Sequence, residues 1–208
     1  MVIYLFSSSK HDGVVNMPLI KFEILKRDVD LANYDLLLFT SKNAVTILDK
    51  INEKWQDIPS IAIGEESARA IVKLGGKVAL ASSGYSKNLA DEIKEKFVNK
   101  KILYIRPKVV ATDHISNLSQ VGIALDEVVL YETICKKYDI LQKPPLDSTL
   151  IFTSPSTINC FMDNFGSMDG YKIVAIGETT AKALPLDVKY SMPKLPNIKE
   201  CINLAFGL

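Results

Sequence analysis

The chain has 208 residues, enough for one large domain or two small ones. Hydrophobic residues make up 48% and charged residues 24%, an ordinary globular composition that allows a core of normal size without additional cross-links. The formal net charge of +1 argues against nucleic-acid binding through a broadly basic surface, so any recognition of anions must be local.

The cysteines and histidines do not form a recognisable metal site. Cys135, Cys160 and Cys201 are odd in number and include no C-x-x-C pair, and only His11 and His114 are available beside them. We therefore expect three reduced, partly buried thiols and no bound metal.

The N-terminal segment MVIYLFSSSK contains a short apolar run without a basic region before it or a small-residue cleavage site after it. It predicts a first strand rather than a signal peptide. No apolar run approaches the roughly 20 residues that a membrane-spanning helix needs. We expect a soluble cytoplasmic protein.

Apolar runs alternate with helical patterns along the chain. LLLF (36–39) suits a strand buried on both faces, and KNAVTILDKI (42–51) after it has apolar residues at helical spacing. SIAI (60–63) and the segment 65–74 repeat this order of strand and helix. Such alternation is typical of βαβ units and a parallel sheet.

Two motifs occur twice with the same offset. Phe-Thr-Ser stands at 39–41 and 152–154, and Ala-Ile-Gly stands at 62–64 and 175–177. In both copies the first Phe precedes the first Ala by 23 residues, so both motifs recur 113 residues later. KNLADEI also resembles PNIKECI, and VIYLF resembles ILYIR. This shared order and spacing indicates an internal duplication.

The duplication predicts two α/β domains with parallel sheets. The extended segments 14–25 and 126–137 each precede a loop and a Phe-Thr-Ser strand, so we expect them to pass from one domain to the other. The predicted division is a discontinuous domain of 1–22 plus 136–208, a continuous domain of 33–130, and connections at 23–32 and 131–135.

The two copies differ in length before the Phe-Thr-Ser strand. Tyr4 to Phe39 spans 35 residues, whereas Tyr104 to Phe152 spans 48. The first copy has too few residues there for a helix, so we expect the terminal domain to lack its first helix. The second copy has room for one within 111–122, capped by Thr112 or Asp113.

The residues after each apolar strand are candidates for anion binding. Ser41 and Ser154 are placed as helix N-caps, and Pro155 follows at the first helical position, where no N–H is needed. The carboxyl edge of an open parallel sheet is where ligands bind, and free N–H groups there favour anions. Helix capping alone remains an alternative for each hydroxyl.

The Ala-Ile-Gly motifs bring a second set of candidates to the same edge. Gly64 and Gly177 allow either close approach of a ligand or a tight turn. Thr179 and Thr180 can bind a ligand or cap a helix. Carboxylates follow each glycine, and we expect them to complement the helix dipole rather than to act as a catalytic pair; they are Glu65, Glu66 and Glu178.

Standard nucleotide-binding and nucleophile motifs are missing, and conventional acid–base residues are few. Several cations follow strand ends, and each one alone can be an ordinary surface charge. If these cations face one cleft, they would together attract a polycarboxylate. They are Lys10, Lys42, Lys87, Arg106 and Lys108.

The repeated motifs, together with ILYIRPK and DEVVLYET, resemble uroporphyrinogen-III synthases over nearly the whole chain. The resemblance implies two flavodoxin-like α/β domains joined by a two-stranded β-ladder, with the active site in the cleft between them. It implies closure of hydroxymethylbilane, a linear tetrapyrrole with eight carboxylates, to uroporphyrinogen III. It further implies that ring D is inverted through a spiro intermediate, that water is lost and that no cofactor takes part.

The resemblance also implies roles for particular residues. VVLYET matches a family segment with an important tyrosine, so Tyr131 is the candidate general acid for departure of the hydroxyl group. A tyrosine that merely packs in a strand is the alternative. The substrate-binding candidates are Ser7, Ser8, Lys10, Ser41, Lys42, Gly64, Ser67, Arg106, Lys108, Thr153, Ser154, Ser156, Gly177, Thr179 and Thr180.

Two segments depart from the family pattern. SSSK follows the first strand where many members have Arg-Pro, and Val109, Val110 and Ala111 stand where a second Arg is common. We therefore expect Lys42 to supply charge, and the Pro155 side to supply backbone donors and hydroxyls. We expect a monomer that binds neither nucleic acid nor membrane. The alternative function is a two-domain protein that closes on a small anion without chemistry.

Overall fold

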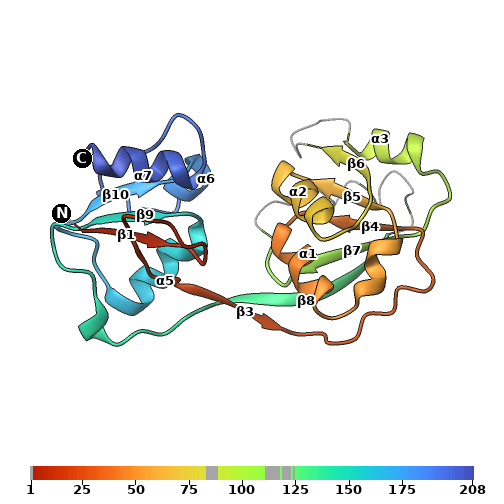
Figure 1. The fold of residues 1–208 in the computed structure, drawn as a ribbon, viewed down its shortest axis with the longest axis horizontal. Helices are drawn as coiled ribbons and strands as arrows, with labels where there is room; N and C mark the ends of the chain where they lie inside the picture. Colours follow the sequence, from red (N-terminus) through yellow and green to blue (C-terminus); the bar gives the residue numbers. More distant parts are fainter. Residues whose placement is uncertain (1, 83–88, 111–117, 119–122, 124) are drawn as a thin grey trace. The chain divides into compact units, whose positions relative to one another are not determined.

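The computed structural model describes residues 2–82, 89–110, 118, 123 and 125–208. Its contacts divide the chain into a continuous unit, Phe22–Glu132, and a discontinuous unit, Met1–Lys21 with Thr133–Leu208. Each unit has its own sheet covered by helices (Figure 1). The predicted class of two α/β domains with mainly parallel sheets is confirmed.

The sheet of the continuous unit has the order β3-β8-β7-β4-β5-β6. All neighbours from β8 to β6 run parallel. Its strands are β3 (Ile20–Ile24), β4 (Leu36–Phe39), β5 (Ser60–Ile63), β6 (Val78–Ser82), β7 (Ile102–Pro107) and β8 (Leu125–Cys135). Its helices are α1 (Lys42–Asp49), the 3₁₀ turn η1 (Glu53–Asp57), α2 (Glu65–Lys73) and α3 (Leu89–Lys96).

Strand β4 lies in the middle of this sheet, and all four of its residues are buried, as its continuous apolar run predicts. Leu37 and Phe39 belong to the core cluster formed with α1, α2 and η1. Leu36 and Leu38 belong to the cluster formed with α3. Because strand side chains alternate, the two clusters cover opposite faces of the sheet.

The discontinuous unit is built in the same way. Its parallel sheet has the order β11-β10-β9-β1-β2. The strands are β1 (Ile3–Phe6), β2 (Val15–Asn16), β9 (Thr149–Phe152), β10 (Lys172–Ala175) and β11 (Tyr190–Ser191). The helices are the 3₁₀ turn η2 (Ile140–Gln142), α5 (Pro155–Phe165), α6 (Glu178–Ala181) and α7 (Ile198–Phe206). Helix α5 packs on one face and α7 on the other.

The chain crosses between the units on strands β3 and β8, which are neighbours (Figure 1). The N–H of Leu25 donates to the carbonyl of Leu130, while the N–H of Lys136 donates to the carbonyl of Leu19. Moving forward along the chain from Leu19 to Leu25 therefore means moving backward from Lys136 to Leu130, so the strands run in opposite directions. They form the two-stranded ladder that the family resemblance implies.

Residues 7–14, between β1 and β2, form turns and bends without a helix. The helix predicted within 111–122 falls almost entirely outside the described residues. The contacts also assign the predicted connection 23–32 to the continuous unit. They divide the predicted connection 131–135 between the two units, after Glu132.

Strand register corrects one part of the sequence comparison. The similarity of VIYLF and ILYIR aligns Tyr4 with Tyr104. In the sheets, however, Leu5 lies opposite Ile151, and Tyr104 lies opposite Leu38. Ile151 and Leu38 each precede the Phe of a Phe-Thr-Ser motif, so the residue equivalent to Tyr104 is Leu5. The local alignment is one residue out of register because apolar strand residues resemble one another.

The expectation of three free thiols is wrong. Cys135 and Cys160 form a disulfide with an S–S distance of 2.09 Å, and only Cys201 is a free, buried thiol among the three. Burial raises the pKa of the Cys201 thiol to about 11. The pairing has no local signature, because it arises where the end of β8 reaches α5, 25 residues away in the chain. Across the described part of the chain, no helix combines the length and apolar character needed to cross a membrane.

Candidate functional site

The carboxyl end of β4 carries the first group of candidate residues. Ser41 is the N-cap of α1, as predicted, and its Oγ accepts a hydrogen bond of 3.2 Å from the N–H of Asn43. The same oxygen lies 3.1 Å from the phenol oxygen of Tyr131. The structure therefore joins two residues that the sequence selected for different reasons, one as a cap and one by family resemblance.

Tyr131 reaches this position because of an irregularity between β7 and β8. Arg106 lies opposite Val129, but Pro107 lies opposite Tyr131, so the register shifts by one residue at the proline. Pro107 has no N–H to continue the ladder, and such shifts often re-aim a side chain near a site. The N–H of Lys108 then donates to the carbonyl of Tyr131 at 2.8 Å.

Tyr131 is buried, with 2% of the residue's surface exposed, and the ring of Phe22 packs edge-on against its ring with the two ring centres 5.3 Å apart. Burial raises the pKa of Tyr131 above its ordinary value of 10, and the hydrogen bond with Ser41 offsets part of that rise. The phenol therefore keeps its proton at neutral pH and can act as a donor.

A second tyrosine reaches the same edge and has no counterpart in the sequence predictions. The phenol oxygen of Tyr104, on β7, lies 3.0 Å from Oγ1 of Thr40, the residue immediately before Ser41. The repeat of Phe-Thr-Ser pointed to Thr40, but Tyr104 appeared only as part of an apolar strand. The signal that could have found it is a polar group in a run that is otherwise aliphatic.

Three predicted cations of the continuous unit have carboxylate partners. Lys42 Nζ lies 3.0 Å from Glu66, and Lys108 Nζ lies 2.9 Å from Glu132. Arg106 Nε lies 2.6 Å from Glu127, and its Nη1 also donates to the carbonyls of Pro107 and Lys108. Arg106 is therefore held by the loop, while the two lysines are more exposed and have one carboxylate each.

The remaining cations differ in what the structure describes. Lys10 is exposed in the loop after β1. Lys87 lies outside the described residues.

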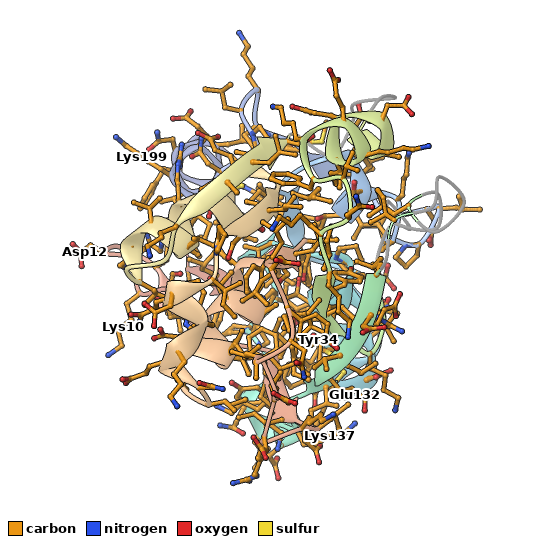
Figure 2. The ribbon with its side chains drawn as sticks, turned by 90° about the vertical axis from the view of Figure 1, so that its right-hand side faces the viewer. Lys10, Asp12, Tyr34, Glu132, Lys137 and Lys199 are labelled. Atoms are coloured by element: carbon orange, nitrogen blue, oxygen red, sulfur yellow. A yellow bond between two sulfur atoms is a disulfide. The ribbon has the colours of Figure 1, made fainter. Side chains whose placement is uncertain are left out.

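Glu132, labelled in Figure 2, lies on β8 next to Tyr131 in the chain, so the pair that it forms with Lys108 lies at the same strand end as the phenol of Tyr131.

The glycines of the two Ala-Ile-Gly motifs adopt different conformations. Gly64 has φ of +89°, which favours glycine, and no atom lies within 4 Å of where a Cβ would be. Gly177 has an extended backbone that any residue can adopt. Each begins a helix without a side-chain cap. Ser67 is buried in the first turn of α2, so its hydroxyl lies in the core rather than at the surface.

The carboxylates after Gly64 lie in the first turn of α2, as expected for residues that complement a helix dipole. Glu65 and Glu66 both pair with Arg69 one turn later, and Glu66 also pairs with Lys42. Glu178 occupies the same place in α6.

The equivalent edge of the discontinuous unit is rich in hydroxyls and has fewer cations. Ser154 is the N-cap of α5 and forms a reciprocal capping box with Thr157, with Pro155 at the first helical position. Thr153 Oγ1 donates to the carbonyl of Phe6 at 3.0 Å. Ser156 is half-buried beside them, so this edge offers backbone N–H groups and a few hydroxyls.

The other predicted hydroxyls of this unit have varied exposure. Ser7 Oγ accepts from the N–H of Ser9 at 3.1 Å, and Ser8 is exposed in the same loop. Thr179 is exposed in α6, whereas Thr180 is buried with 3% of its surface accessible. Thr179 is therefore better placed than Thr180 to meet a ligand.

A surface hollow of about 300 Å³ lies elsewhere in the discontinuous unit. It is lined by the starts of β10 and β11, including Lys172, Lys189 and Tyr190. This is the amino end of the sheet, so the hollow is not part of the carboxyl edge that carries the candidates. Among the described residues, no group of three or more His, Cys, Asp or Glu side chains is arranged to hold a metal ion.

Comparison with models of protein families shows to which family the chain belongs. The family model described as uroporphyrinogen-III synthase HemD matches residues 12–203. The chain belongs to the uroporphyrinogen-III synthase family. The family that the motifs of the sequence indicated is thereby confirmed.

Solved structures agree with the family assignment. Uroporphyrinogen-III synthetase from Helicobacter pylori has 27% identity and a TM-score of 0.83, with 99% of this chain and 98% of that chain covered. A mutant uroporphyrinogen III synthase from the extreme thermophile Thermus thermophilus has 13% identity and a TM-score of 0.53, with 91% of this chain and 85% of that chain covered. The second likeness concerns the fold alone. No curated protein sequence matches the chain.

Proposed function

We propose that this chain closes hydroxymethylbilane to uroporphyrinogen III with inversion of ring D, and that Tyr131 is the general acid. Membership of the family supports the reaction. The observation that supports the role of Tyr131 is its 3.1 Å contact with Ser41 at the carboxyl edge of the sheet, where ligands of parallel sheets bind.

The first chemical step needs a proton. The C–O bond of the hydroxymethyl group breaks, and the oxygen leaves as water once it is protonated, which produces an azafulvene cation. A phenol with a raised pKa keeps its proton until a strongly basic leaving group approaches. Ser41 holds the phenol in position, and its own position is fixed by capping α1.

The later steps need orientation more than acid–base groups. The cation can close without help, but it then gives the isomer without inversion. For inversion, the substituted carbon of ring D must attack to form the spiro intermediate, which then opens and closes again. Holding a flexible chain in one folded arrangement can accelerate the correct closure by orders of magnitude. This fits a site with few titratable side chains.

The carboxylates of the substrate supply the means of holding it. The N-termini of α1 and α5 present N–H groups that have no partner within the helix, and helix dipoles favour negative charge at that end. The hydroxyls of Ser154, Ser156 and Thr179 add donors in the discontinuous unit. Lys42 and Lys108 add positive charge in the continuous unit when a carboxylate of the substrate displaces their own carboxylate partners.

We also propose that the protein is a monomer in the cytoplasm. The duplication supports the monomer, since one chain already contains both sets of helix starts and hydroxyls that the substrate needs. Light scattering after size-exclusion chromatography tests it, and the expected mass is that of a single 23.1 kDa chain.

The experiment that tests the function is a product analysis. The protein is incubated with freshly generated hydroxymethylbilane, the products are oxidised, and the porphyrin isomers are separated. We expect isomer III to dominate and to form faster than in a sample with heat-denatured protein. Isomer I alone, at the rate of the denatured control, would exclude the enzyme. Tight binding of the substrate without isomer III would favour a non-catalytic binding protein.

A further inference from the structure

We propose that Tyr104 is a positioning residue for the cyclisation, because its phenol fixes the hydroxyl of Thr40 as a hydrogen-bond donor to a carboxylate of the substrate. The proposal rests on the function proposed above and adds two residues to its site. It starts from the 3.0 Å contact between the Tyr104 phenol and Thr40 Oγ1.

The ring of Tyr104 lies in the core, and its phenol oxygen contacts Thr40. Only 2% of its surface is exposed, and its ring packs in the cluster with Leu36, Leu38 and Ile93 on the α3 face of the sheet. Thr40 is more exposed and stands just beyond the last residue of β4. We therefore assign the effect of the phenol on a ligand to its contact with Thr40.

The two tyrosines reach consecutive hydroxyls from opposite faces of the sheet. Tyr131 belongs to the cluster of α1 and α2 and contacts Ser41. Tyr104 belongs to the cluster of α3 and contacts Thr40. Because β4 lies between β7 and β5 in the sheet, this pair of hydroxyls lies at the centre of the carboxyl edge rather than at its margin.

The discontinuous unit shows which side chain is enough to pack at the position of Tyr104. By strand register, the residue equivalent to Tyr104 is Leu5, which is fully buried against α7. Thr153, equivalent to Thr40, donates its hydrogen to the carbonyl of Phe6 instead. An aliphatic side chain is therefore enough to fill this place in the core, whereas a buried phenol needs a hydrogen-bond partner.

The difference between the copies determines where each threonine's hydrogen points. In the discontinuous unit the hydrogen of Thr153 is used within the protein. In the continuous unit either hydroxyl can be the donor of the bond between Tyr104 and Thr40. The proposal assigns the phenol as the donor, which leaves the hydrogen of Thr40 free to donate to a ligand. Burial raises the pKa of Tyr104, so the phenol remains protonated and able to donate at neutral pH.

A hydroxyl with its hydrogen free, next to the N-cap of α1, suits a carboxylate oxygen. The carboxylate would also meet the N–H groups that begin α1. The contact exists in the bound substrate as well as in the transition state, because the side-chain carboxylates take no part in the bond changes. Losing it should therefore raise KM and leave kcat nearly unchanged.

The test uses Tyr104→Phe and Thr40→Val, which remove one hydroxyl each, singly and together. Each single variant should raise KM for hydroxymethylbilane about 5- to 10-fold, the loss expected for one hydrogen bond, with kcat within about 2-fold. The double variant should have a KM no higher than that of either single variant, since both substitutions remove the same contact. Thr40→Ser keeps the hydroxyl and should retain a KM near that of the wild type.

The matched control is Tyr34→Phe. The Tyr34 phenol, labelled in Figure 2, donates to Asp126 at 2.9 Å near the start of β8, at the amino end of the sheet. This variant loses a phenol hydrogen bond in the same unit and should leave KM unchanged. An unchanged KM in Tyr104→Phe would overturn the proposal, even if the melting temperature fell. Additive effects in the double variant would do the same.

A second measurement separates this proposal from the proposed function. Binding of uroporphyrin III, an octacarboxylate of the product type, is followed by its fluorescence with each variant. If the wild type makes isomer III but Tyr104→Phe binds the porphyrin as tightly as wild type, only the role of Tyr104 fails. If the wild type makes no isomer III, the proposed function fails. Weaker porphyrin binding by Tyr104→Phe and Thr40→Val would then still support the anion contact.

Discussion

The phenol oxygen of Tyr131 lies 3.1 Å from Oγ of Ser41, the residue that caps helix α1. Tyr131 and Ser41 are 90 residues apart in the chain. The contact ties the candidate acid to the start of helix α1. In the proposed mechanism, proton donation and carboxylate binding thus depend on one local arrangement at the end of β4.

Replacing Tyr131 with Phe should lower kcat about 100-fold or more, the lower end of what a positioned general acid contributes. The ring still fills its place beside Phe22, so the melting temperature should fall by only a few degrees. Steady-state rates of isomer III formation and thermal unfolding measure the two effects. Unchanged turnover would remove Tyr131 from the mechanism.

The two buried tyrosines predict how stability responds to alkaline pH. Burial raises the pKa of both Tyr104 and Tyr131, so the unfolded chain loses these protons at a lower pH than the folded chain does. Stability from both groups is then fully present below about pH 10 and is lost as pH rises through the folded pKa values. Melting temperatures of Tyr104→Phe should fall less steeply above pH 10 than those of the wild type. Parallel curves would contradict this.

Glu66 should compete with the substrate for Lys42. Replacing it with Gln frees the ammonium group and should lower KM about 2- to 5-fold at low salt, the range expected from an exposed ion pair. The gain should shrink at high ionic strength, because screening weakens exposed charges. Glu92→Gln is the control, since Glu92 pairs with Lys96 on α3, outside the candidate site. An equal change in both variants would indicate a general charge effect.

Reduction of the Cys135–Cys160 disulfide should destabilise the discontinuous unit. A loop of 25 residues predicts a loss of about 3.5 kcal/mol in the free energy of unfolding, from the greater entropy of the reduced unfolded chain. Thermal unfolding with and without a reductant measures it, and Cys135→Ser should abolish the difference between the two conditions.

The control for this experiment is Cys201→Ser. Cys201 is buried and unpaired, so the variant should keep the full response to reductant. Mass spectrometry under non-oxidising conditions tests the bond itself, since closure removes two hydrogens. Two free thiols at Cys135 and Cys160 in the protein isolated without reductant would contradict the bond.

Several features could be predicted from the sequence because they depend on short segments. The run LLLF indicated a buried strand, and Ser41 and Ser154 were correctly expected as N-caps. Capping depends on a residue and its next three neighbours, which the sequence shows directly. Tyr131 was selected through family resemblance, because an apolar strand with one tyrosine carries no signal of its own.

Other features could not be predicted because they depend on which residues meet across the sheet. Glu66, Glu127 and Glu132 turned out to be partners of the candidate cations. The local alignment made Tyr104 equivalent to Tyr4, whereas strand register makes it equivalent to Leu5. A shift of one residue moves a side chain to the other face of a strand, so the comparison of short apolar segments could not identify the pairing with Thr40.

The sequence by itself determined the duplication, the strand–turn–helix order of each copy, the hydroxyl groups at the strand ends and the family. These depend on periodicity and on motifs within a few residues, where the chain's own geometry leaves little choice. Only the tertiary structure decided that Tyr104 contacts Thr40, that Tyr131 contacts Ser41, and that Cys135 bonds to Cys160. Each of these contacts joins segments distant in the chain, and strand order and register, rather than local preference, bring them together.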